Sequence, residues 1–478
     1  MTLGGDSQPE RTSKLPIIAA LVVLVVAIGT GLTLHALSGS SGPSYPKAWD
    51  PRIAPLAAIA EKDRGLKFLH PVYVDFLSPA EFAKQVTSGS KSLSPTDRKQ
   101  IAQAQGMLRA LGLISDKTDL LKEMNTLNSS GVLGLYSDDD KRIRVRGTKL
   151  TPAVKVTLVH ELTHVLQDQH YDLLAKFKPL DASKTEDSSA FDAVVEGDAT
   201  RIQNEYRSSL PQAVQKQLDK SDNADSVAFD KASKNVPGFL VTEMGAPYAL
   251  GEIAVTLAAN GGGNAGVDAL FENPPTHQIQ LVKPWLMGTT WKSPSFTKPV
   301  LGAGQKELGR GEFGAFDLYL VLAERIPTVQ ALAAADGWDA DQYVSYSENN
   351  RTCVRAAFTG TDGAATGRLD AALTRWASGS HGSAKVSQSG QIVTLDACDP
   401  GSDYRLPADH SDQAMQLLGT RNSIEMQVEK DGAPQSFAVC FAVTAAQRLT
   451  VPELQANSLP PAQTHELRQI AATCRAQG

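Results

Sequence analysis

The sequence predicts a mostly helical α+β protein with a small antiparallel sheet just before a long helix, an N-terminal transmembrane helix and a small β-rich C-terminal region. Three observations support this fold class. Long segments poor in Gly and Pro begin with helix start signals, two short strand-like runs frame an acidic turn, and one apolar run near the N-terminus lacks charged residues. The length of 478 residues is enough for two or three domains.

The apolar run at residues 15–37 contains no Asp, Glu, Lys or Arg. As a helix it spans roughly 30 Å of hydrocarbon at about 1.5 Å per residue. A cleaved signal peptide is the alternative, but its apolar core is usually about 7–15 residues long, and this run lacks a clean A-x-A cleavage site. We therefore expect a membrane anchor at 15–37, a cytoplasmic tail at 1–14 and a Gly/Ser/Pro-rich linker at 38–49.

The four cysteines indicate on which side of the membrane the chain lies. They are Cys353, Cys398, Cys440 and Cys474, with no C-x-x-C spacing. An even number of cysteines behind an export signal is typical of disulfides in an oxidising compartment. Three pairings are possible, and proximity in the sequence favours Cys353–Cys398 with Cys440–Cys474. We expect a single-pass cell-membrane protein with a cytoplasmic N-terminus and an extracytoplasmic body; secretion after signal-peptide cleavage is the alternative.

The composition argues against a nucleic-acid partner. The formal net charge is −6 and the pI is near 5.9, without the basic excess of nucleic-acid-binding proteins. The oligomeric state does not follow from the sequence.

Residues 50–384 are expected to form the main domain, and residues 385–478 a C-terminal region that contains disulfides. Within the main domain, "GVLGLY" and "RIRVRG" read as two strands joined by the acidic turn "SDDDK". After about residue 385 the sequence pattern changes to short runs typical of β-strands, such as "NSIEMQVEKDG" and "SFAVCFAVT".

Two helices follow the predicted hairpin. Thr151 is suited to cap the first and Pro152 to begin it, and no Gly or Pro interrupts it up to Leu174. The second helix is expected at about 188–212, around "FDAVVEGDAT".

The first helix carries the H-E-x-x-H pattern. His160 and His164 are four residues apart, so both imidazoles face one point, as a tetrahedral Zn²⁺ requires. Glu161 lies beside that point, where a carboxylate accepts a proton from a zinc-bound water. Satisfied core histidines are the alternative interpretation.

The third zinc ligand has two candidates. His170 has the metzincin spacing H-E-x-x-H-x-x-G-x-x-H, but Gln167 stands where the glycine that turns the chain should be. On an unbroken helix His170 faces away from the ion. Glu196 on the second helix completes a His₂Glu site and is the favoured candidate.

Several other polar residues are candidates for supporting roles. Asp168, Asp192 and Asp198 are suited to accept the second N–H of a zinc-bound histidine, although each is equally well explained as a solvated charge. Tyr248 and His277 are candidate donors to the oxyanion of a tetrahedral intermediate.

Five segments carry a family resemblance. H-E-L-T-H followed by E-G-D-A on a later helix resembles the gluzincin class of zinc metallopeptidases. "HELTHVLQDQHYDL", "VVEGDAT", "PYALGE", "NPPTHQIQLVKP" and "AADGWDADQY" are similar to a family of bacterial secreted or membrane-anchored neutral zinc metallopeptidases, over roughly residues 60–400. The chain departs from that family in having "PPTHQIQLVKP" where "PPxSTEQ…HP" is expected.

The resemblance implies a zincin-like catalytic domain at 50–384 that binds Zn²⁺ through His160, His164 and Glu196, with Glu161 as the catalytic base. We therefore expect a membrane-anchored, extracytoplasmic zinc metallopeptidase that acts on a protein or peptide. We also expect the predicted hairpin to bind an extended peptide by strand addition along "RIRVRG". The alternatives are a non-catalytic envelope protein that kept the fold for binding, and a zinc hydrolase of a non-peptide bond.

Overall fold

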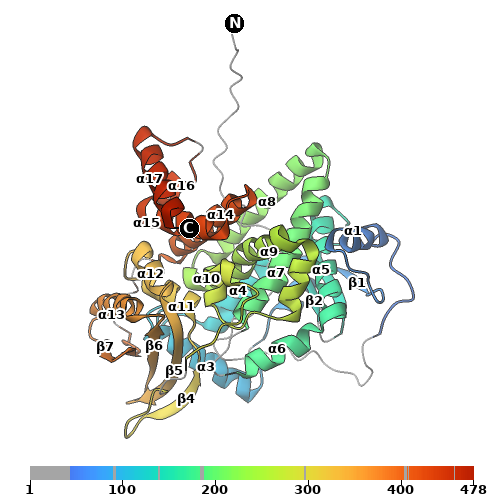
Figure 1. The fold of residues 1–478 in the computed structure, drawn as a ribbon. Coiled ribbons are helices and arrows are strands. Elements are labelled where there is room, and N and C mark those ends of the chain that lie inside the picture. Colours follow the sequence, from blue (N-terminus) through green and yellow to red (C-terminus); the bar gives the residue numbers. More distant parts are fainter. Residues whose placement is uncertain are drawn as a thin grey trace.

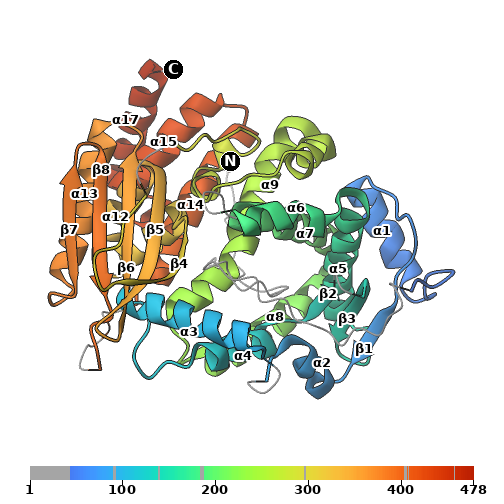
Figure 2. The same cartoon turned by 90° about the horizontal axis from the view of Figure 1, so that it is seen from below.

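The computed structural model describes residues 44–89, 93–137, 140–183, 188–294, 298–402, 406, 409–456 and 458–477. The fold is α+β with abundant helices, as predicted, and its two small sheets lie on opposite sides of a helical centre (Figures 1 and 2). The helices at the centre are α5 (Pro152–Tyr171), α7 (Ser189–Ser209) and α9 (Gly238–Glu272). The other helices are α1 (Ala54–Arg64), α2 (Pro79–Val86), α3 (Pro95–Ala110), α4 (Leu120–Gly131), α6 (Leu173–Ala182), α8 (Gln212–Ser233), α10 (Ile279–Val282), η1 (Pro284–Leu286), α11 (Ala315–Ala323), α12 (Thr328–Ala335), α13 (Gly363–Ser378), α14 (Ser411–Lys430), α15 (Gln435–Arg448), α16 (Val451–Leu454) and α17 (Pro461–Gln477).

The smaller sheet confirms the predicted hairpin. Strands β2 (Gly134–Ser137) and β3 (Arg142–Arg146) pair antiparallel, and β1 (Val74–Leu77), which the sequence did not reveal, pairs parallel with β3. The strand order is β1-β3-β2. Since β3 has a neighbour on each side, the expected addition of a peptide along "RIRVRG" is wrong; the outer strand of the hairpin is β2.

Helix α5 forms as its sequence predicts. The Thr151 hydroxyl accepts a hydrogen bond from the Val154 N–H, and Pro152 occupies the first helical position. The helix ends at Tyr171 and is followed by Asp172, whose φ is 50°. Every residue from Val156 to Asp168 is buried. The helix therefore lies inside the molecule, with the sheet β1-β3-β2, α1 and α7 packed around it.

Helices α7 and α9 cross at very short range. A Cβ atom on Gly197 would lie 2.2 Å from the backbone carbon of Gly251, and one on Gly251 would lie 1.9 Å from the Ala193 carbonyl oxygen. Glycine is thus required on both helices at the crossing. The small residues around Glu196 allow α7 to pack closely against other helices, and these are α9 as well as α5.

The larger sheet is fully antiparallel, in the order β4-β5-β6-β8-β7. Its strands are β4 (Lys306–Gly311), β5 (Trp338–Glu348), β6 (Arg351–Gly360), β7 (Ala384–Ser389) and β8 (Ile392–Cys398). Side chains of this sheet share one large core with α11, α12, α13, α9 and Ala193 of α7. The hairpin β7–β8 therefore completes a sheet that begins well before residue 385.

The expected β-rich C-terminal region is wrong beyond residue 398. "NSIEMQVEKDG" lies in or just after α14, and "SFAVCFAVT" lies in α15. In "NSIEMQVEK" the alternating Ile424, Met426 and Val428 imitate a strand, yet all three are only half-buried. The buried side chains follow the helical period instead, for example Ala438, Ala442, Ala445 and Ala446 in α15.

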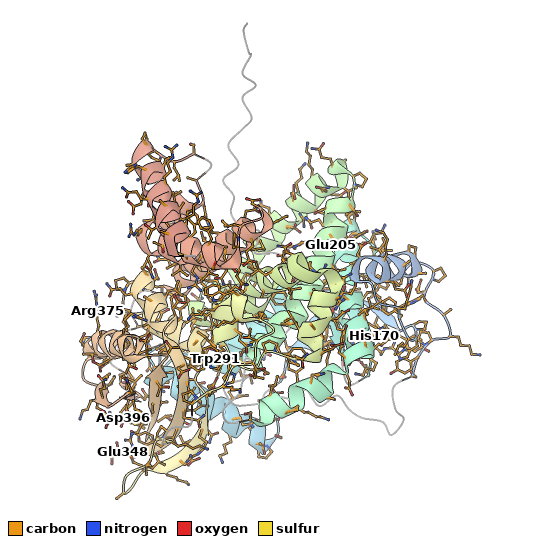
Figure 3. All side chains as sticks on the ribbon, in the orientation of Figure 1. His170, Glu205, Trp291, Glu348, Arg375 and Asp396 are labelled. Carbon is orange, nitrogen blue, oxygen red and sulfur yellow. A yellow bond between two sulfur atoms is a disulfide. The ribbon has the colours of Figure 1, made fainter. Side chains whose placement is uncertain are left out.

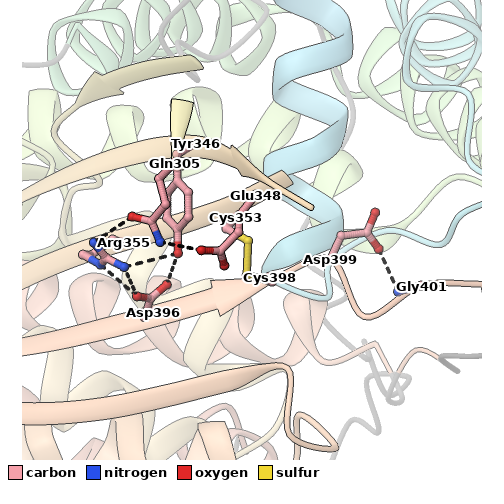
Figure 4. Close-up of a disulfide and its surroundings, with 9 residues drawn as sticks. All are labelled: Gln305, Tyr346, Glu348, Cys353, Arg355, Asp396, Cys398, Asp399 and Gly401. Carbon is pink, nitrogen blue, oxygen red and sulfur yellow. Dashed lines mark hydrogen bonds and ion pairs between the residues drawn. A yellow bond between two sulfur atoms is a disulfide. The ribbon is translucent and has the colours of Figure 1, made fainter. Parts of the chain in front are cut away.

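Both predicted disulfides are present. Cys353–Cys398 joins neighbouring strands β6 and β8 (Figure 4), and Cys440–Cys474 joins α15 and α17. Beside the first bond, Asp396 accepts hydrogen bonds from Tyr346 and Arg355 across three strands.

The predicted tail, the membrane anchor at 15–37 and the first part of the linker lie outside the described residues. Among the helices that the structure does describe, none combines the length and apolarity needed to cross a membrane.

Candidate metal centre

The two histidines of the H-E-x-x-H pattern lie on the buried part of α5. His160 is fully buried and His164 is 5% exposed. Their side chains converge, with 3.0 Å between the two Nε2 atoms. The four-residue spacing on an unbroken helix produces this convergence, as predicted.

Glu196 reaches the same point from α7. Its Oε2 lies 3.2 Å from His160 Nε2 and 3.4 Å from His164 Nε2, and the carboxylate is almost fully buried. Among the described residues, these three form one of two groups whose ligand atoms all lie within 4.8 Å of one another.

The three atoms have the spacing of a metal-binding set. A tetrahedral ion with bonds of about 2.0–2.1 Å holds its ligand atoms about 3.3–3.4 Å apart, close to the 3.0–3.4 Å found here. Two imidazoles and one carboxylate also match the donor set of catalytic zinc, which leaves the fourth position to water. The residues present therefore fit a zinc ion.

The electrostatics of the site favour positive charge where the three atoms meet. Burial opposes a charged His164, but Glu196 and Glu161 outweigh it and raise the pKa of His164 to about 10. Burial likewise opposes a charged Glu196, but the two histidines outweigh it and lower the pKa of Glu196. Burial lowers the pKa of His160. The two carboxylates thus stabilise positive charge on the side of the site that His164 occupies.

Glu161 lies next to this point and faces strand β2. A Cβ atom on Gly134 would lie 2.5 Å from Glu161 Oε1, so the carboxylate lies directly against the β2 backbone. Burial, aided by the charge of Glu196 and opposed by that of His164, raises the pKa of Glu161 to about 8. Glu161 is thus near enough to His164 and Glu196 for their charges to act on it, and it is not one of the three residues whose atoms converge.

His170, the rejected third ligand, lies outside the site. It is exposed near the end of α5 (labelled in Figure 3), and its Nε2 lies 2.7 Å from the Lys67 carbonyl oxygen. The absence of a glycine at position 167 lets the helix continue, which keeps His170 on the outer face.

Two of the three aspartates expected to support the histidines, Asp168 and Asp198, have other partners. Asp168 accepts hydrogen bonds from the Tyr136 hydroxyl and from Lys141, and so fixes the hairpin β2–β3 to α5. Asp198 accepts from Arg64 and Arg201. The group that contacts His164 Nδ1 is Gln167, at 2.9 Å, which sequence reasoning missed because it treated Gln167 only as a missing glycine.

The two candidate oxyanion donors lie in different surroundings. The ring of Tyr248, on α9, stacks near that of His160 with 6.1 Å between the centroids. His277 belongs to another cluster, where its Nδ1 lies 2.7 Å from the Thr276 hydroxyl and its Nε2 lies 2.9 Å from the Ser293 hydroxyl.

A second group with metal-ligand spacing is Glu348, Cys353 and Cys398 (Figure 4). Its two sulfur atoms form a disulfide, so neither is available as a thiolate ligand. The group His160, His164 and Glu196 is thus the stronger metal site in the part of the chain that is described.

Comparisons of the chain with protein-family models, with curated proteins and with solved structures gave no match.

Proposed function

We propose that the chain is a zinc-dependent metallopeptidase of the gluzincin type. The observation that carries the proposal is the convergence of two imidazole nitrogens and one carboxylate oxygen within 3.0–3.4 Å, with a buried glutamate beside them. Two core histidines paired with Glu196 alone would not account for a second buried carboxylate, Glu161, beside the same point.

The chain's own residues supply the proton transfers. Glu161 accepts a proton from the attacking water and returns it to the leaving amine, because its carboxylate lies beside the ligand atoms in a buried environment. When bound, zinc supplies Lewis acidity toward that water and the scissile carbonyl. Tyr248 is the better placed of the two candidate oxyanion donors because its ring lies next to that of His160.

An extended peptide is the substrate class that suits the surroundings. Strand β2 is the outer strand of its sheet, and its residue Gly134 directly contacts the Glu161 region. A peptide that pairs with β2 therefore runs past the catalytic carboxylate, and its backbone hydrogen bonds give affinity without a fixed sequence.

The proposed location is the outer side of a membrane. Two disulfides support an oxidising compartment, and residues 15–37 are apolar enough for an anchor. Protease added to intact cells should digest the body of the protein. Complete protection of the body in intact cells, with digestion after lysis, would place it inside.

The test of the proposed function uses the full chain in mild detergent. Wild type should bind one equivalent of zinc and cleave casein or a mixed peptide library. Glu161→Gln should retain zinc and lose activity by about 10³-fold or more, because a general base contributes about 10²–10⁴-fold. Glu196→Ala should lose both, whereas His170→Ala, on the same helix, should change neither.

The outcomes separate the competing functions. A wild type without zinc contradicts the metal site. Zinc binding without cleavage of any peptide, in wild type and Glu161→Gln alike, favours a binding protein that kept the fold. Glu161-dependent cleavage of ester but not peptide substrates favours a hydrolase of another bond.

A further inference from the structure

Gln167 is a fully buried amide on α5, one turn after His164. Its Oε1 lies 2.9 Å from His164 Nδ1, and its Nε2 donates to the Val195 carbonyl at 3.0 Å and to Asp198 Oδ2 at 3.1 Å. The oxygen and both amide hydrogens therefore have partners.

The partners determine how the amide is oriented. The Val195 carbonyl and the Asp198 carboxylate only accept hydrogen bonds, so the NH₂ group of Gln167 must face them. Its oxygen then faces His164, and Nδ1 of that histidine must be the donor. Nε2 is left for the side of the ring that faces His160 and Glu196.

The same amide connects the two helices that hold the ligands. Val195 and Asp198 lie on either side of Glu196 in α7, whereas His164 lies on α5. Asp198 is itself held by fully buried Arg64, whose Nε lies 2.6 Å from its carboxylate. The position of His164 relative to Glu196 is thus fixed through a chain of buried polar contacts.

His160 has no comparable support. Within the described residues, its buried Nδ1 has no hydrogen-bond partner. Among the described residues, Gln167 is therefore the one side chain outside the three converging residues that makes a hydrogen bond to either histidine ring.

We propose that Gln167 is a positioning residue of the metal site. It holds His164 as the Nδ1–H tautomer with Nε2 toward the ion, and it fixes this ring relative to Glu196. The inference rests on the proposed zinc site and explains why glutamine occupies the position where a metzincin has glycine.

Zinc affinity of the full chain, measured by competition with a chromophoric chelator, tests the proposal. Gln167→Met keeps the side-chain volume but removes all three hydrogen bonds, and should bind zinc about 10–100-fold more weakly. Gln167→Asn, one methylene shorter, should also weaken binding. Gln167→Glu retains an acceptor for His164 and should stay within about threefold of wild type while its apo form unfolds at a lower temperature, since it faces Asp198.

Gln169→Met is the matched control. Gln169 is another amide on α5, but it contacts Leu69 and His70 rather than the site. This variant should leave zinc affinity and the visible spectrum of the Co²⁺ form unchanged, whereas Gln167→Met should alter that spectrum.

Two results would overturn the role of Gln167 alone: wild-type affinity in Gln167→Met, or equal losses in Gln167→Glu and Gln167→Met. Absence of zinc from wild type would instead overturn the proposed function together with this inference. The readout is binding rather than catalysis, so a failure of Glu161 chemistry does not affect it.

Discussion

At residue scale, the absence of a side chain at Gly134 is what lets the candidate base lie against β2. A methyl group there would lie 2.5 Å from Glu161 Oε1 and 2.6 Å from Thr157 Cγ2. Gly134→Ala should therefore displace the carboxylate and lower kcat about 10–100-fold, because small misplacements of catalytic groups are costly. Zinc content should stay at one equivalent, since no ligand is touched.

Gly419→Ala is the control for this substitution, because an added Cβ there meets nothing within 4 Å. Unchanged peptidase activity in Gly134→Ala would mean that Glu161 is not the base, or that β2 moves aside without cost.

Glu425, on α14, is a buried carboxyl whose ionised form destabilises the folded protein. Burial, together with the nearby charge of Glu429, raises the pKa of Glu425 to about 8 against the opposing charge of Arg421. Below about pH 4.5 both folded and unfolded chains hold the proton; between pH 4.5 and 8 the unfolded chain releases it first, so stability falls as pH rises through this window.

Glu425→Gln should remove that penalty. The free energy of unfolding should increase by about 2 kcal/mol at pH 8.5 and change little at pH 4.5, as measured by urea denaturation. Asp412→Asn, an exposed carboxyl on the same helix, should show no such difference. An equal gain at both pH values would contradict the titration argument.

At the scale of elements, the crossing of α7 and α9 determines where Glu196 lies. Gly197 directly follows Glu196, and its added Cβ would collide with the backbone of Gly251 at 2.2 Å. Gly197→Ala should lower the free energy of unfolding by about 1–3 kcal/mol and weaken zinc binding, because the two helices must separate. Gly245→Ala, on α9 with nothing within 4 Å of its added Cβ, should be neutral or slightly stabilising. Normal zinc affinity in Gly197→Ala would show that Glu196 is positioned independently of this crossing.

Elements with strong local signals could be predicted from the sequence. Helix α5 has its cap and no helix breaker, and the hairpin β2–β3 has alternating residues around a turn. Strand β1 was not predicted because its partner β3 lies about seventy residues later, and no local sequence pattern indicates a parallel pairing. The short apolar runs in α14 and α15 are compatible with either a helix or a strand, and only tertiary packing decides between the two.

At the scale of the whole molecule, the candidate site lies where separate hydrophobic clusters meet. Helix α7 contributes Ala193 to the large core with the five-stranded sheet, Ile202 to the core around α5, and Val194 to a third cluster. The convergence of His160, His164 and Glu196 could be predicted because it depends on helix periodicity and on one carboxylate motif. The Gln167 contacts could not, because they exist only after α5 and α7 have packed.

The disulfides and the metal site should stabilise the molecule independently. Cys353–Cys398 closes a loop with a sequence separation of 45 inside the five-stranded sheet, whereas the ligands lie on α5 and α7. Replacing both cysteines by alanine should lower the free energy of unfolding by about 2–4 kcal/mol, because the unfolded chain regains loop entropy. The folded double variant should bind zinc within about twofold of wild type, measured by chelator competition at a temperature where circular dichroism shows it folded.

A Cys440→Ala, Cys474→Ala double variant, whose cysteines have a sequence separation of 34, provides the comparison on the C-terminal helices. Loss of zinc from a folded Cys353/Cys398 variant would mean instead that the sheet transmits its distortion through the shared core to α7.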